Sequence, residues 1–208
     1  MSDVGEVTMY LQSARDALVW KLDGLTERQV RTPMTPTGTN LLGLVKHTAG
    51  VEAGYLGETF GRSFPEPLPW MDDDAEPNAD MFATPDESID DVVALYRRVW
   101  EHSDVTLAEL PLDTVGEVPW WAPAKRRTTL HRIAVHVIAE TNRHAGHADI
   151  VRETIDGATG LRADNSNLPN LDWPAYRAHL EAIAASFETP GAAPAPSRPS
   201  IVGEHLTD

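Results

Sequence analysis

One long stretch without proline, between Thr128 and Gly157, most limits the folds open to this chain. Thr128 or Thr129 can cap the start of a helix in this stretch. Gly157 can mark its end, because glycine commonly follows the last turn of a helix. The pattern therefore predicts a single helix that continues to Ile155.

Apolar residues at spacings of three and four predict further amphipathic helices. The predicted helices cover residues of about 7–22, 40–56, 84–110, 129–155 and 173–187. The third is expected to start at Thr84, with Pro85 at its first position and Glu87 three residues after the cap. Strand-like alternation is not evident. Four long helices and one shorter helix predict an all-α four-helix bundle with an additional C-terminal helix.

The domain organisation follows from length and composition. A chain of 208 residues with 41% hydrophobic content can bury one sizeable core, so residues 1–187 are predicted to form one helical domain. Residues 61–83, rich in proline, glycine and aspartate, are predicted to be a long surface loop. Residues 188–208 are rich in Pro and Ala and are predicted to be a disordered tail.

Charge and cysteine content exclude several classes of function. The formal net charge of −15 repels phosphate backbones and anionic membrane surfaces, so neither nucleic acid nor membrane is expected as a partner. The chain has no cysteine, so a metal site must use His and carboxylate ligands. The start MSDVGEVTMY lacks signal-peptide character, and the default prediction is a cytoplasmic protein.

A polar row follows one side of the long helix, where His136, Glu140, His144 and His147 recur at spacings of four and three residues. Glu140 and His144 stand about 6 Å apart along the helix, close enough for both to reach an ion about 2.1 Å from each. The alternative is that the row faces solvent, as polar residues mostly do. His47 is the candidate ligand from another helix, although a lone His is more often a half-buried packing residue.

The stretches LLGLVKHTAGVE and HRIAVHVIAETNRHAGHADIVRETIDG resemble the two ligand helices of the DinB-like metalloprotein superfamily. This superfamily is a four-helix bundle that binds one divalent metal, and the resemblance covers about residues 5–187. Glu in place of the middle His is similar to the branch of mycothiol-dependent maleylpyruvate isomerase and mycothiol S-transferase. Carried over by position, the metal ligands are expected to be His47, Glu140 and His144. Zinc is the expected ion, with Ni, Co, Fe and Mn as alternatives.

The resemblance implies that a low-molecular-weight thiol such as mycothiol takes a free position on the ion and reacts with an electrophilic substrate by S-transfer or isomerisation. His147 is predicted to accept the proton of the thiol or of water, with the orientation of a ligand or a solvated surface position as the alternatives. Trp120 and Trp121 are candidate walls of a substrate pocket. Arg143 is a further candidate substrate-binding residue, although it points about 100° away from His144.

Two other functions use the same residues. One is a non-catalytic, stress-related metal-binding bundle, and the other is a metal-dependent hydrolase. Ligand identity does not distinguish thiol from water as the nucleophile. The oligomeric state also stays open, with a homodimer among the alternatives.

Overall fold

The computed structural model of the chain describes residues 3–72 and 74–187. The chain divides into two compact units, Met1–Ser166 and Asn167–Asp208. The helices of the first unit are α1 (Asp3–Val19), α2 (Glu27–Arg31), α3 (Leu41–Glu52), α4 (Ile89–Glu109) and α5 (Leu130–Asp156). Its strands are β1 (Val115–Glu117) and β2 (Arg127–Thr129), and its short helical turns are η1 (Trp20–Leu22), η2 (Ala53–Gly57), η3 (Glu58–Phe60), η4 (Pro69–Met71), η5 (Ala79–Met81) and η6 (Pro123–Lys125).

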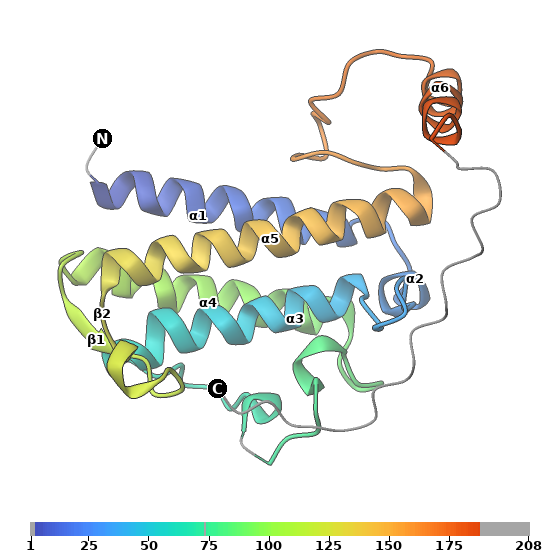
Figure 1. Cartoon of the computed structure of the whole chain (residues 1–208). Helices are drawn as coiled ribbons and strands as arrows, with labels where there is room; N and C mark the ends of the chain where they lie inside the picture. Colours follow the sequence, from blue (N-terminus) through green and yellow to red (C-terminus); the bar gives the residue numbers. More distant parts are fainter. Residues whose placement is uncertain (1–2, 73, 188–208) are drawn as a thin grey trace. The chain divides into compact units, whose positions relative to one another are not determined.

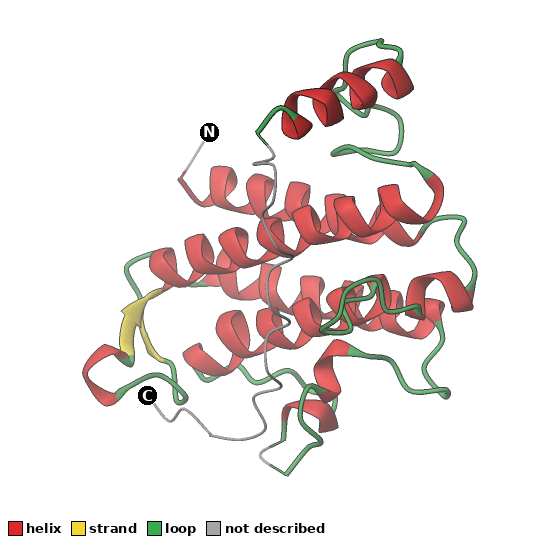
Figure 2. Ribbon diagram, turned by 45° about the vertical axis from the view of Figure 1, so that its right-hand side comes forward, coloured by secondary structure: helices red, strands yellow, loops and turns green. Residues whose placement is uncertain are grey.

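Four long helices form the bundle of the first unit. α1 lies beside α5, and α3 lies beside α4, with α3 also packed on α5 (Figure 1). The antiparallel pair β1 and β2 sits at one end of the bundle, next to the start of α5 (Figure 2). The prediction of an all-α four-helix bundle is therefore confirmed.

Apolar side chains from all four helices fill the core. Fully buried examples are Leu11, Leu18, Leu44, Leu56, Val99, Leu107, Ile133 and Val137. A buried ion pair crosses this core, with Arg15 Nη2 2.5 Å from Glu52 Oε1 and Arg15 Nη1 2.8 Å from Asp104 Oδ1. Arg15 thus joins α1 to Glu52 at the end of α3, where the pair is fully buried, and to the partly exposed Asp104 of α4.

Side-chain caps mark the starts of α3 and α5, and Thr129 at the start of α5 is one of the two predicted capping residues. The Asn40 side chain accepts from the Gly43 N–H at the start of α3, and Thr129 accepts from the Arg132 N–H at the start of α5. Gly157 ends α5 with a φ of 80°, in the left-handed region. These local signals fix where α3 and α5 begin, and hence the height of each polar group along the bundle.

Two sequence expectations need correction. α4 begins at Ile89 rather than near Pro85, because Ser88 and Asp91 form the capping box. Glu87 instead accepts from the Thr84 N–H and pairs with Lys46. The β1–β2 hairpin was not expected, because strands of three residues are too short to show alternation.

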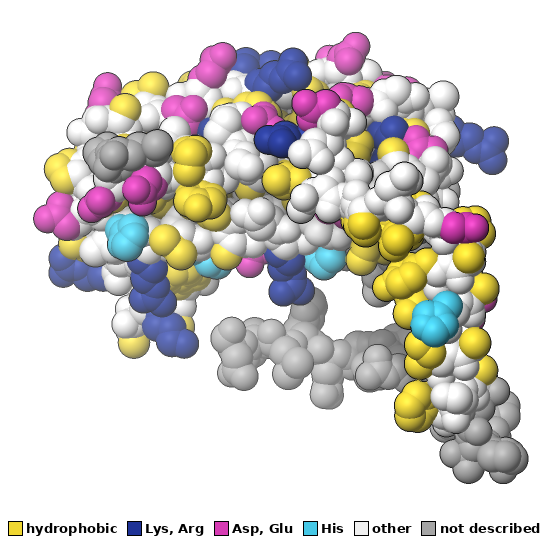
Figure 3. Space-filling view, turned by 90° about the horizontal axis from the view of Figure 1, so that it is seen from above, with side chains coloured by type: hydrophobic (Ala, Val, Ile, Leu, Met, Phe, Trp, Pro, Cys, Tyr) yellow, Lys and Arg dark blue, Asp and Glu magenta, His cyan; other side chains and the backbone are white. Residues whose placement is uncertain are grey.

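The second unit contains α6 (Trp173–Ala185), which starts at Trp173 as predicted. The predicted tail, residues 188–208, lies outside the described residues, and a single domain over 1–187 stays a prediction. Among the residues that the structure describes, no helix is both long and apolar enough to cross a membrane. On the face shown in Figure 3, acidic side chains are spread out with basic ones between them.

Candidate functional site

The polar row of α5 faces α3, and two ring contacts define how the helices meet. The His47 and His144 rings lie 4.7 Å apart between centroids, and the Tyr55 and His136 rings lie 4.6 Å apart. Because residue numbers rise along α3 as they fall along α5, the two segments run antiparallel. Glu140, midway between His136 and His144, therefore lies at the height of α3 between His47 and Tyr55.

His144 is more enclosed than Glu140, one turn before it in the row. Its side chain is 12% exposed, and its Nε2 lies 3.5 Å from Glu140 Oε2, too long for a strong hydrogen bond. Its Nδ1 is buried and has no hydrogen-bond partner. Burial lowers the pKa of His144 to about 4, with further lowering from His47 and an opposing effect of Glu140. The imidazole is therefore neutral at pH 7 and keeps a lone pair for a ligand.

His47 has a partner from outside the bundle helices. Its Nδ1 lies 2.5 Å from Asp80 Oδ2, and Asp80 belongs to the turn η5 within the long loop before α4. Both side chains are about three-quarters buried. This contact leaves Nε2 of His47 as the nitrogen not engaged by Asp80.

The remaining predicted residues on α5 are more open to solvent. His147 is exposed, and its ring centroid lies 5.5 Å from that of His144. Arg143 is exposed as well, and its charge is one of the influences that lower the pKa of His144. A Cβ added at Gly146 would meet open space. The row is thus half-buried at its centre and exposed at its end, rather than uniformly facing solvent.

Trp120 and Trp121 gather around Tyr55 at the other end of the row. The indole N–H groups of both tryptophans donate to Tyr55 Oη, over 3.3 Å from Trp120 and 3.0 Å from Trp121. Arg126 Nε donates to the Trp121 carbonyl over 2.8 Å and holds this loop. His136 contacts both Tyr55 and Trp121, so the aromatic group continues the polar row.

A cleft of about 910 Å³ opens beside this aromatic group. Its walls include Gly50, Val51, Gly54 and Trp120, and Val51 is one helical turn beyond His47. A Cβ at Gly54 would approach the Trp120 ring to 3.1 Å, so the glycine lets the indole pack closely on the helix. The cleft is large enough for a small organic ligand, and Trp120 is the predicted site residue that lines it.

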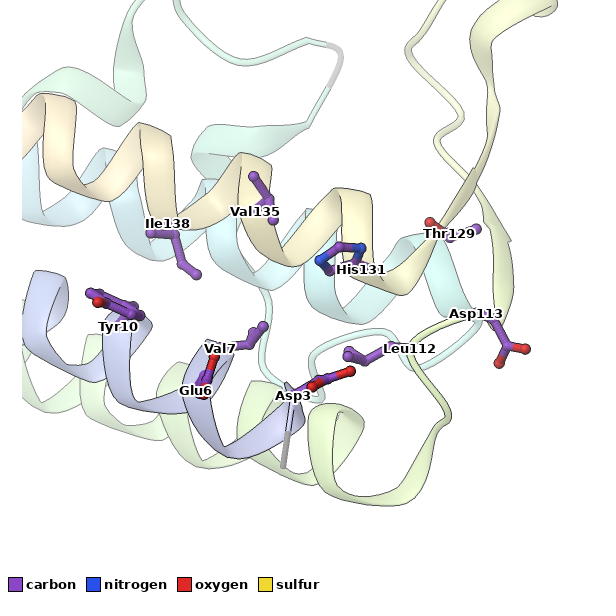
Figure 4. Close-up of a pocket in the computed structure, with 10 residues that line it drawn as sticks. All are labelled: Asp3, Glu6, Val7, Tyr10, Leu112, Asp113, Thr129, His131, Val135 and Ile138. Carbon is purple, nitrogen blue, oxygen red and sulfur yellow. The ribbon is translucent and has the colours of Figure 1, made fainter. Parts of the chain in front are cut away.

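A separate hollow of about 640 Å³ lies between α1 and the start of α5 (Figure 4). His131, Val135 and Ile138 line it from a face of α5 that does not carry the polar row. None of the predicted site residues lines this hollow. It is therefore not the candidate site.

His47, Glu140 and His144 are side chains of the types that bind divalent ions. Two imidazoles and one carboxylate are a common ligand set for zinc, and Nε2 of His144, which lies 3.5 Å from Glu140 Oε2, is the nitrogen that could share an ion with Glu140. Within the ranges 3–72 and 74–187, no group of three or more His, Cys, Asp or Glu side chains already has the arrangement of metal ligands. The structure brings His47, Glu140 and His144 together, and their role as ligands stays a prediction.

A four-helix bundle in which His47 of α3 faces His144 of α5, with Glu140 one turn before His144, has the arrangement expected of the DinB-like class. The sequence profile of the mycothiol S-transferase family matches residues 6–157. The chain belongs to the mycothiol S-transferase family, which gives it a thiol-related function.

A crystal structure of a conserved protein from Enterococcus faecalis is similar in fold. Its TM-score is 0.57 at 16% identity, and the match covers 76% of this chain and 99% of that chain. At this identity the likeness shows the fold alone. A search of curated proteins found no match.

Sequence reasoning missed Asp80 and Tyr55 as members of the site. Asp80 sits in a loop without periodicity, 33 residues after His47, so no spacing connects the two. Tyr55 lies on η2, where the helix widens into a π-helical turn, a feature often found at functional sites. Gly50 and Gly54, four residues apart, were the available signal that another element approaches this face.

Proposed function

We propose that this protein is a metal-dependent mycothiol S-transferase in which His47, Glu140 and His144 hold one divalent ion. The observation that carries the proposal is the approach of His144 on α5 to both His47 on α3 and Glu140, with a cleft that opens at Val51, one turn beyond His47. Membership of the mycothiol S-transferase family supplies the thiol. The electrophile is a small molecule that enters the same cleft.

Each residue has a distinct part in this proposal. A bound divalent ion would lower the pKa of a thiol so that the thiolate forms near neutral pH. His147 accepts the thiol proton and returns it to solvent, because it is exposed and one turn from His144. Trp120 and Trp121 wall the space for the unreactive part of the thiol. Arg143 attracts an anionic group on either substrate.

Metal analysis and a conjugation assay test the proposal together. Purified protein should carry close to one divalent ion per chain, and His144→Ala should lose most of it. His131→Ala is a matched control, because it removes an exposed histidine from the same helix away from the row. Mycothiol and a chlorinated or epoxide electrophile should form a thioether with the metal-loaded protein, and chelation should abolish the product.

Each alternative function predicts a different product. Hydrolysis of the electrophile without incorporation of the thiol would support the metal-dependent hydrolase. Bound metal without turnover across thiols and electrophiles would support the non-catalytic metal-binding bundle. A full equivalent of metal held with native affinity by His144→Ala would show that the ligand assignment is wrong. Cytoplasmic location and a homodimer stay predictions from the sequence.

A further inference from the structure

The long loop before α4 places one carboxylate, that of Asp80, against His47. Asp80 Oδ2 lies 2.5 Å from His47 Nδ1, and the two side chains are 24% and 23% exposed. A carboxylate at this distance from an imidazole nitrogen forms a strong charge-assisted hydrogen bond. Because an ionised carboxylate only accepts hydrogen bonds, Nδ1 of His47 must carry the hydrogen.

The backbone next to Asp80 is fixed to α3 by separate contacts. The Asn40 side-chain amide donates to the Met81 carbonyl over 3.1 Å, and Lys46 Nζ donates to the Phe82 carbonyl over 3.1 Å. A Cβ added at Gly43 would lie only 1.8 Å from Met81 O, so the loop backbone rests directly on the helix. These contacts place Asp80 by the structure around it rather than by its attraction to His47 alone.

We propose that Asp80 is a positioning residue that holds His47 in the tautomer with hydrogen on Nδ1 and a free lone pair on Nε2. This inference rests on the proposed function, because the lone pair is needed for a metal ligand. Carboxylate partners of ligand histidines fix the ring orientation and raise the basicity of the ligand nitrogen. Through Asp80 the loop orients a metal ligand, and Asp80 itself does not bind the ion.

Three variants separate positioning from other roles. Asp80→Ala removes the acceptor and should weaken zinc affinity by about 10- to 100-fold in competition with a chelator. Asp80→Asn keeps an oxygen acceptor and should recover most of that affinity. Asp86→Ala is the matched control, because it removes an exposed carboxylate from the same loop, and it should leave the affinity unchanged.

The tautomer of His47 gives a readout that does not depend on metal or turnover. Imidazole ¹⁵N spectra of the metal-free protein should show hydrogen on Nδ1 of His47 in the wild type and in Asp80→Asn, with a mixture in Asp80→Ala. An unchanged tautomer in Asp80→Ala would overturn the proposal. Equal loss of zinc affinity in Asp80→Asn and Asp80→Ala would also overturn it, because that result identifies a ligand. If the wild type binds no zinc, the proposed function fails, while the spectra still decide the role of Asp80.

Discussion

Two neighbouring histidines of α5 have different surroundings and so suit different tasks. His144 is mostly buried, and burial keeps its pKa near 4, so it is neutral at physiological pH as a metal ligand must be. His147 is exposed one turn further on, where it can exchange protons with water. A spacing of three residues is enough for this division, because the two positions differ in exposure: His144 is partly buried and His147 is exposed.

Replacing His147 tests whether it takes part in proton transfer. His147→Ala should slow turnover by roughly 10²-fold while the protein keeps its metal, because general bases contribute on that order. The loss should appear in kcat more than in KM, since the proton acceptor acts on the reacting group. Steady-state kinetics and metal analysis on the same preparation measure both effects.

Two other outcomes would reassign His147. Loss of metal in His147→Ala would identify it as a ligand and remove the need for Glu140 in that role. Unchanged kinetics with metal retained would identify His147 as a solvated surface residue.

At the scale of the helices, two glycines on the site-bearing elements have opposite surroundings. A Cβ at Gly43 of α3 would collide with the Met81 carbonyl, whereas a Cβ at Gly146 of α5 would meet open space. Gly43→Ala should therefore lower the free energy of unfolding by about 1–3 kcal/mol through overpacking. Gly146→Ala should raise it by about 0.5–1 kcal/mol, because alanine restricts the unfolded chain and favours the helix.

Urea denaturation of both variants and of the wild type measures these two changes in the free energy of unfolding. If Gly43→Ala were as stable as the wild type, the loop would not rest firmly on α3. A loss of stability in Gly146→Ala would mean that another surface does occupy the space beside it.

The end of α5 depends on a carboxylate whose effect should disappear in acid. Arg152 donates to Asp156 from Nη2 over 2.7 Å and also holds the Lys21 and Asp23 carbonyls at the end of η1. The Arg152 hydrogen bonds lower the pKa of Asp156 below its usual 3.8. The folded state therefore favours the charged form, and this stabilisation is present above about pH 3.8 and is lost as pH falls through the lowered value.

Asp156→Asn should accordingly cost about 1–2 kcal/mol at pH 7, the range for a charge-assisted hydrogen bond that is partly open to water. The difference from the wild type should shrink as urea titrations are stepped down toward about pH 3. Glu181→Gln is a suitable control, because its pair with Arg177 is exposed and should contribute little. A constant difference across pH would show that the loss comes from packing rather than from charge.

Helices with strong local signals were predictable, and features made by tertiary contact were not. The caps Asn40 and Thr129 lie next to regular apolar spacing, so α3 and α5 were placed closely from the sequence. The start of α4 was misplaced because Glu87 has the spacing of a capping-box residue, whereas its carboxylate forms an ion pair with Lys46 of α3. Local patterns define elements, and they do not show which charged group an element will meet.

At the scale of the whole molecule, the candidate site also combines residues that local patterns predict with residues that only tertiary contacts bring in. Helical spacing connects Glu140 with His144, and the family motif adds His47; the fold places His144 next to both, and their role as ligands stays a prediction. Asp80 could not be predicted, since only the path of the loop across α3 brings it to His47. The bundle supplies the regular part of the site, and the loops complete it.

The last prediction concerns how much of the chain the bundle needs. Every buried hydrophobic residue among those described lies between Leu11 and Val151, and the family match ends at residue 157. A chain that ends at Ser166 should therefore fold cooperatively, melt within about 5 °C of the intact protein and keep its metal affinity. A chain that ends at residue 188 should behave like the intact protein, because the removed composition cannot bury a core. Thermal melts and metal-binding assays of both truncations test this. A large loss of melting temperature only in the shorter chain would show that residues 167–188 stabilise the bundle. A loss in both chains would assign that role to the tail.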